Sequence, residues 1–210
     1  MRSQKKKTIQ MVQTALFSGI LCVLAPIALP VPGSPVPLSL ATFAVYLTGM
    51  ILGAKQGVLS VLVYLFLGMV GLPVFSGFSG GVGVLLGPTG GYLLGYIPCV
   101  LIIGVLADKK IYRKEKLKTD LINDYKKPLK TTLYYGVAMS VGTILCYLVG
   151  TVWFVCVMDG SYSFVQALIV CVVPYPAFDA MKIVAAAAIG VPLRRLLRSR
   201  ESSFVYGDFR

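Results

Sequence analysis

The sequence contains no histidine, and only eight of its 210 residues are aspartate or glutamate. Its five cysteines are scattered through apolar stretches without a CxxC pair, so we expect neither a metal site nor a disulfide framework. The phosphate-binding pattern GxxxxGK followed by Ser or Thr is also missing. We therefore expect no ATP site and no bound cofactor in this chain, and any ATP-driven step would need a partner.

The sequence consists mainly of long apolar runs. Hydrophobic residues make up 57% of the sequence, charged residues only 13%, and the mean hydropathy is +0.81. This composition predicts a single all-α integral membrane domain over residues 1–210. About 20 apolar residues cross a hydrocarbon core about 30 Å thick. On that basis we expect six transmembrane helices, at about 9–29, 37–53, 57–73, 89–107, 132–158 and 177–197.

The last apolar region, 161–191, is too long for one crossing and contains Pro174 and Pro176. Proline removes a backbone donor and disfavours helix at the residue before it. We therefore predict a short apolar helix over 162–173 that does not span the membrane, followed by the sixth crossing.

Positive charge predicts the orientation of the chain. The net charge is +12, and all lysines and arginines except Lys182 lie before the first span, at Lys55, in the 108–130 loop or from Arg194 onward. Positively charged loops stay in the cytosol, so we expect both termini and the 108–130 loop there. The charge is then an orientation signal that also favours contact with the lipid bilayer. We expect no nucleic-acid partner, because no basic–aromatic module is visible.

Asp179 and Lys182 are the only Asp, Glu, Lys or Arg side chains within the apolar stretches. A charge at membrane depth costs roughly 2.5–3.5 kcal/mol on insertion scales, so such residues usually mark a functional site. Residues three apart share one face of a helix. A carboxylate beside an ammonium suits an uncharged ligand head that both donates and accepts hydrogen bonds. A structural ion pair that locks two helices together would use the same two residues.

A glycine-rich segment is predicted on the same outer side of the membrane. Nine glycines fall between Gly71 and Gly95, which allows tight turns and close backbone approach. We expect three aromatic residues of this segment to pack on the apolar part of a ligand: Phe75, Phe78 and Tyr92. A compact loop that only caps the bundle is the alternative.

Two short motifs could indicate further functions. Residues 77–81 match GxSxG, so an intramembrane serine hydrolase with Ser79 as nucleophile and Lys182 as base is one alternative function. Such a serine usually needs a histidine base, and we expect no enzyme activity. In the first helix, Ala15 and Gly19 form a small-xxx-small pair, which serves either packing within the chain or contact with another membrane subunit.

The run Val36–Tyr96 closely resembles the BioY family, the biotin-binding S components of energy-coupling factor (ECF) transporters. The resemblance is carried by LGxxGLPVF at Leu67–Phe75, LGPTGGYLxG at Leu86–Gly95, and a PxxDxxK arrangement at Pro176, Asp179 and Lys182. It covers about residues 10–195. Where many members carry asparagine or arginine before LGPTGG, this chain has SGFSGG, so the polar contact of that loop is expected at Ser79 or a backbone amide.

The resemblance implies six helices and a biotin site near the outer face of a prokaryotic cytoplasmic membrane. Its polar sixth-helix residues, Asp179 and Lys182 here, contact biotin, with Asp179 expected on a ureido N–H and Lys182 on the ureido carbonyl or the valerate carboxylate. It also implies a transmembrane coupling subunit, contacted through Ala15 and Gly19, and two cytosolic ATPases. An S component for another small vitamin is the nearest alternative.

Overall fold

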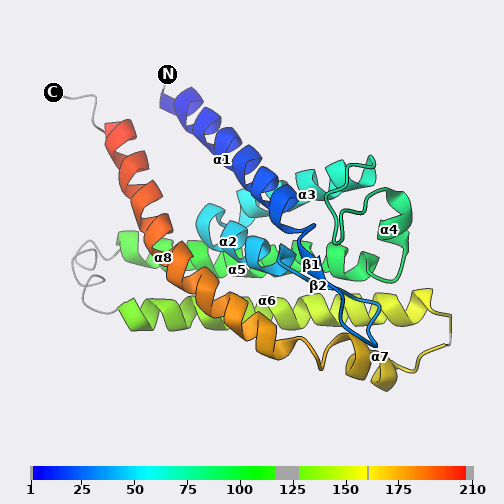
Figure 1. Ribbon diagram of the computed structural model, residues 1–210. Coiled ribbons are helices and arrows are strands. Elements are labelled where there is room, and N and C mark those ends of the chain that lie inside the picture. Colours follow the sequence, from blue (N-terminus) through cyan, green and yellow to red (C-terminus); the bar gives the residue numbers. More distant parts are fainter. Residues whose placement is uncertain (1, 117–127, 160, 207–210) are drawn as a thin grey trace.

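The computed structural model describes residues 2–116, 128–159 and 161–206 (Figure 1). This part of the chain is helical apart from its loops and one antiparallel pair of two-residue strands. The elements in order are α1 (Arg2–Leu24), β1 (Ala28–Leu29), β2 (Leu38–Ser39), α2 (Ala41–Leu52), α3 (Ala54–Met69), α4 (Val82–Leu86), α5 (Gly90–Lys116), α6 (Pro128–Val157), α7 (Phe164–Cys171) and α8 (Pro176–Tyr206).

The mainly helical membrane architecture is confirmed. Among the described residues, α1, α5, α6 and α8 are long and apolar enough to cross a membrane. Helices α2 and α3 are apolar too, but their 12 and 16 residues are fewer than the roughly 20 that a straight crossing needs.

The region before α2 differs from the all-α prediction. Helix was expected from about residue 37, whereas Leu38 and Ser39 pair with Ala28 and Leu29 as β2 and β1. The Ser39 hydroxyl accepts the Ala41 N–H at 2.9 Å and donates to the Ala25 carbonyl at 2.7 Å. These side-chain bonds hold the backbone outside the helix until Ala41, in the way serine competes with helical hydrogen bonds.

The proline break has the expected effect near the C-terminus. Helix α7 lies where a short apolar helix is predicted, and α8 begins at Pro176. Ser163 and Gln166 start α7 with reciprocal side-chain to backbone bonds, a capping box that satisfies two free N–H groups.

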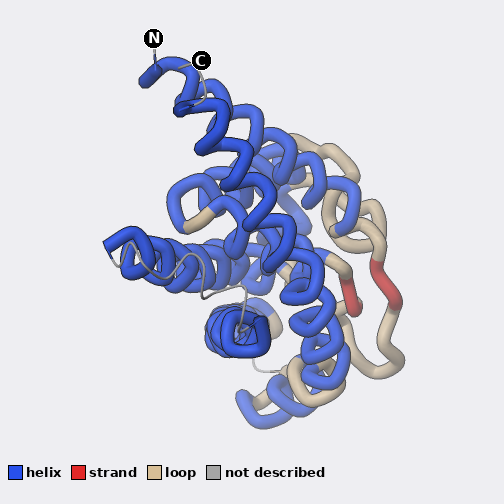
Figure 2. Tube along the Cα trace, turned by 90° about the vertical axis from the view of Figure 1, so that its left-hand side faces the viewer, coloured by secondary structure: helices blue, strands red, loops and turns tan. Residues whose placement is uncertain are grey.

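Two ends of the molecule can be distinguished. The start of α1, the later part of α8 and the facing ends of α5 and α6 lie toward one end, whereas α4, α7 and the β1–β2 pair lie toward the other (Figure 1). The strands and most of the loops gather on the side away from the termini (Figure 2). The loop expected over 108–130 is helical as far as Lys116 and again from Pro128, and 117–127 lie outside the described residues.

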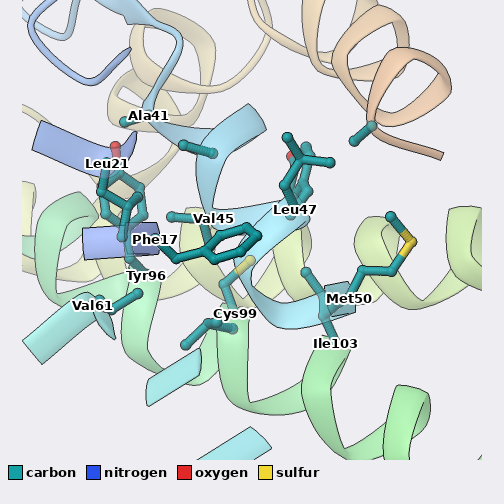
Figure 3. Packing of buried hydrophobic residues seen from close by; sticks show 14 of the residues in the cluster. Phe17, Leu21, Ala41, Val45, Leu47, Met50, Val61, Tyr96, Cys99 and Ile103 are labelled. Carbon is teal, nitrogen blue, oxygen red and sulfur yellow. The ribbon is translucent and has the colours of Figure 1, made fainter. Parts of the chain in front are cut away.

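The largest buried cluster is formed mainly by α1, α2, α3 and α5. Phe17 of α1 lies beside Val45 of α2 and Cys99 of α5, and Ile103 of α5 lies near Met50 of α2 (Figure 3). Large apolar side chains on the outer faces of α1, α6 and α8 remain exposed, as expected for surfaces that face lipid rather than water. A cavity borders this core at the loop-rich end of the molecule.

Candidate ligand-binding site

A cavity of about 190 Å³ opens where the loops, α5, α6 and α8 converge. Segment 36–39 and Thr42 form one wall, and the glycine-rich segment forms a second wall with Phe75 and Ser79. Helices α5, α6 and α8 contribute, among others, Tyr92, Tyr147, Asp179 and Lys182. The structure thus brings together five of the six side chains that the sequence proposes as ligand contacts.

Asp179 and Lys182 lie next to each other on α8 and are ion-paired at 3.0 Å. The Lys182 ammonium also donates to the Ser39 carbonyl at 2.7 Å and to Thr42 Oγ1 at 3.0 Å. Thr42 Oγ1 in turn donates to Asp179 Oδ1 at 3.3 Å, and the Tyr147 hydroxyl donates to Oδ2. The pair therefore ties α8 to α2, β2 and α6, as the structural interpretation of these residues also requires.

The hydrogen-bonding capacity of the two side chains is used unequally. An ammonium has three N–H donors, and all three have acceptors here. A carboxylate offers about four acceptor positions, of which Oδ1 uses two and Oδ2 uses one. Asp179 lines the cavity and is 4% exposed, so the remaining acceptor position of Oδ2 is buried and has no partner among the described residues.

Two aromatic side chains form rigid apolar walls. Phe75 is fully buried and meets Tyr64 edge to face at 5.6 Å between ring centroids. A Cβ on Gly68 would collide with the Phe75 ring, so the glycine makes room for this wall. Tyr92 is 8% exposed, and its hydroxyl lies 3.3 Å from Thr151 Oγ1.

A strap over residues 30–37, between β1 and β2, borders the cavity through Val36 and Pro37. The Tyr175 hydroxyl holds the strap by donating to the Val36 carbonyl, and it also lies 2.8 Å from Ser34 Oγ. Burial raises the pKa of the Tyr175 phenol above its usual value of 10.0, so the hydroxyl stays protonated and remains a donor at neutral pH. The strap is therefore fastened to the α7–α8 connection.

The sequence predicts that Phe78 contacts the ligand, but Phe78 does not line the cavity. Its side chain is 70% exposed, because the backbone turns at Phe78 with φ of 58° and directs the residue away from the bridge between Phe75 and Ser79. Ser79 does line the cavity, but its hydroxyl donates to the Ser76 carbonyl at 2.9 Å. Since the Lys182 protons all have other acceptors, the two residues do not form a serine–lysine dyad in this structure.

Ala15 and Gly19 lie on the outer face of α1. Both residues are exposed, and no described residue comes within 4 Å of a Cβ placed on Gly19. The inner face of α1 packs instead through Ser18, which donates to the Ser60 carbonyl at 3.1 Å, and Thr14, whose carbonyl accepts from Ser60 Oγ at 2.8 Å. The small-xxx-small pair is thus not used for packing against the described part of the chain.

Sequence reasoning missed the polar groups that hold the charged pair and the strap. The Ser39 carbonyl and the hydroxyls of Thr42 and Tyr147 come from two distant segments that only folding brings to α8, whereas Tyr175 directly precedes α8 and bonds the strap. Ser39 and Thr42 carry a faint signal, since they are polar residues at the start of an apolar run.

The chain is similar to known proteins over most of its length. The model of the BioY family matches residues 1–199. "Biotin transporter BioY" of Thermotoga maritima is 35% identical over 89% of this chain and 96% of its own length. "Probable biotin transporter BioY" of Pyrococcus horikoshii is 33% identical over 90% of this chain and 98% of its own. The crystal structure of the S-component for biotin from an ECF-type ABC transporter superposes with a TM-score of 0.72 and 26% identity, covering 92% of this chain and 93% of that one.

Proposed function

This chain belongs to the BioY family, and we propose that it is a membrane protein that captures biotin for uptake, as the S component of an ECF-type ABC transporter. It is a transport protein and not an enzyme. The observation that carries the proposal is the cavity at the loop-rich end, where a buried carboxylate between apolar walls keeps an acceptor position that no described residue fills.

The ureido head of biotin matches this site chemically. It has two N–H donors and one carbonyl acceptor in a compact ring. Asp179 can accept one ureido N–H at Oδ2 without losing any existing partner. Lys182 would have to release one of its three acceptors to bind the ureido carbonyl or the valerate carboxylate. We therefore assign the first ligand contact to Asp179, and to Lys182 the positioning of that carboxylate.

The apolar parts of biotin suit the walls of the cavity. Phe75 and Tyr92 are rigidly packed, so they offer flat surfaces to the thioether ring and alkyl chain without losing side-chain freedom on binding. Ser79 lies close enough to the cavity to serve as a polar contact at its rim.

We propose six crossings in the cytoplasmic membrane of a prokaryote, with the shorter α2 and α3 completing the six and both termini in the cytosol. The lysine-rich end then faces the cytosol and the cavity faces outward. The chain would carry no cofactor and no nucleotide, and would take its energy from a transmembrane coupling subunit with two cytosolic ATPases.

The test is biotin binding to the purified chain and to its Asp179→Asn variant. Hydrogen bonds to charged groups contribute about 1.5–3 kcal/mol, so affinity should fall about 10- to 100-fold. Asp159→Asn removes an exposed carboxylate outside the cavity and is the matched control, which should bind like the parent. Equal affinity of the parent and Asp179→Asn would refute the site.

The ligand itself is tested by thermal unfolding with biotin and with a panel of other small vitamins. A ligand stabilises the folded state by RT ln(1 + [L]/Kd), so biotin at 100 times its Kd should add about 2.7 kcal/mol. A shift with another vitamin and none with biotin would replace biotin as the ligand while leaving the transport class in place.

A further inference from the structure

Arg194 lies on α8 toward the end of the bundle that carries the termini, far along the helix from the ligand cavity. Its side chain is only 11% exposed. Its guanidinium donates to the Met50 carbonyl of α2 and to the Tyr135 hydroxyl of α6 at 3.4 Å. It also lies 3.6 Å from Asp108 Oδ1 of α5. One side chain thus connects α8 to three other helices.

These contacts converge on the tight elbow between α2 and α3. Met50 belongs to the last turn of α2, where carbonyl groups have no partner within the helix, and Arg194 satisfies one of them. Asp108 Oδ2 accepts the Ala54 N–H at 3.0 Å, so the same ion pair also satisfies the first turn of α3. Gly53 forms the elbow with φ of 81°, and a Cβ there would collide with the Asp108 carboxylate. The elbow is thus held by caps supplied from α5 and α8.

Helix α8 therefore grips α2 at both ends. At the outer end, Lys182 and Asp179 hold Thr42. At the inner end, Arg194 holds Met50. Thr42 and Met50 are eight residues apart, about 12 Å at 1.5 Å per residue. Two fixed points along one helix determine both its rotation and its shift relative to α8.

We propose that Arg194 is a positioning residue for the biotin site, an inference that rests on the proposed function. By fixing the inner end of α2 on α8, Arg194 sets the register in which Thr42 and Ser39 meet Lys182 and Asp179. Those contacts occupy the Lys182 donors and leave the Oδ2 position of Asp179 vacant for the ligand. A change at Arg194 is then felt at a site that it does not touch.

The first measurement is biotin affinity of Arg194→Met in detergent. Residues that couple to a distant site typically change affinity by about 2- to 30-fold, and we expect a loss in that range. Arg194→Lys keeps the charge but cannot reach two acceptors as a fork, so its affinity should lie between those of the parent and Arg194→Met. Lys55→Met removes an exposed cation from the same elbow and should leave affinity unchanged.

A double-mutant cycle that combines Arg194→Met with Thr42→Val distinguishes positioning of the site from a purely structural role. The measured quantity is biotin affinity. Sites more than about 7–10 Å apart with no shared partners usually have additive effects. If Arg194 acts through α2, Thr42→Val should weaken binding by a clearly smaller factor in the Arg194→Met background than in the parent. Additive losses, or unchanged affinity of Arg194→Met, would overturn the inference. If Arg194→Met does not fold, Arg194→Lys takes its place in the cycle. A parent protein that does not bind biotin would instead refute the proposed function.

Discussion

A carboxylate and an ammonium are tolerated inside this helix bundle because neither is left without partners. Asp179 has three donors around it and Lys182 has three acceptors, supplied by α2, β2, α6 and α8 itself. Removing one member of a buried pair leaves the other uncompensated, which is strongly destabilising. The structural and the functional interpretations of the pair are therefore compatible, because the ion pair orients the carboxylate that the ligand would meet.

Phe78 shows that an aromatic residue beside a site need not belong to it. A non-glycine residue in the left-handed region costs about 1–2 kcal/mol, and Phe78 has φ of 58° with a 70% exposed side chain. Phe78→Gly should therefore raise the free energy of unfolding by up to about 1 kcal/mol. Biotin affinity should stay the same, because the side chain does not line the cavity.

Thermal unfolding and biotin binding of the same preparations measure both effects. Phe78→Ala is the matched control: it removes the ring but keeps the Cβ, so it should not gain this stability. A loss of affinity in both variants would show that Phe78 contacts the ligand after all.

At the scale of elements, the cavity depends on a segment without regular structure. The strap over 30–37 contains four prolines, which lack the N–H groups that a longer hairpin would pair. It is fastened from outside by Tyr175, and its far end is fixed by Ser39. Such a segment opens more easily than a packed helix, since few backbone hydrogen bonds must break.

Tyr175→Phe should therefore speed biotin release. One net hydrogen bond contributes about 1 kcal/mol, so dissociation should be about fivefold faster. The rate is measured by chasing bound labelled biotin with excess unlabelled biotin. Tyr134→Phe is the matched control, because it removes a phenol that donates to the Leu106 carbonyl at 2.8 Å, away from the cavity. Equal release rates for the two variants would contradict a fastening role for Tyr175.

At the scale of the whole molecule, the charged residues and the small residues of α1 lie on different parts of the surface. Apart from Lys182, the lysines and arginines of the described residues lie in the start of α1, the α2–α3 elbow, the facing ends of α5 and α6 and the later part of α8, whereas the cavity lies toward the loop-rich end. On the side of the bundle, Ala15 and Gly19 have small exposed side chains, so the surface of α1 is shallow there. No described residue comes within 4 Å of a Cβ placed on Gly19. A partner helix could approach closely there, as small residues allow in membranes.

Replacing Ala15 and Gly19 together by leucine should abolish co-purification with the proposed coupling subunit and ATPases. Biotin binding to the isolated chain should persist, because neither residue lines the cavity. Leucine at Ala185 and Ala188, two exposed small residues of α8, is the matched control for added bulk on the lipid-facing surface. Co-purification that survives the α1 changes would place the partner on another face.

Local properties of the chain were enough to predict its class and its most informative residues. Apolar run length identifies the long helices, since crossing a membrane needs a minimum length, and Pro174 and Pro176 separate α7 from α8. The insertion cost of a charge singles out Asp179 and Lys182 without any knowledge of their surroundings. Each of these arguments depends on residues close together in the sequence.

The environment of the pair depends on how distant segments pack. Thr42 lies 137 residues from Asp179 in sequence, Ser34 lies 141 residues from Tyr175, and Met50 lies 144 residues from Arg194. No periodicity or motif relates such positions, because hydrogen bonds between distant segments form only after the helices have packed. Local sequence therefore predicts a membrane protein with a charged pair inside an apolar helix. Helix packing determines which groups bond to Asp179 and Lys182, and which acceptor position of Asp179 no described residue fills. The turn at Phe78 keeps that side chain out of the cavity.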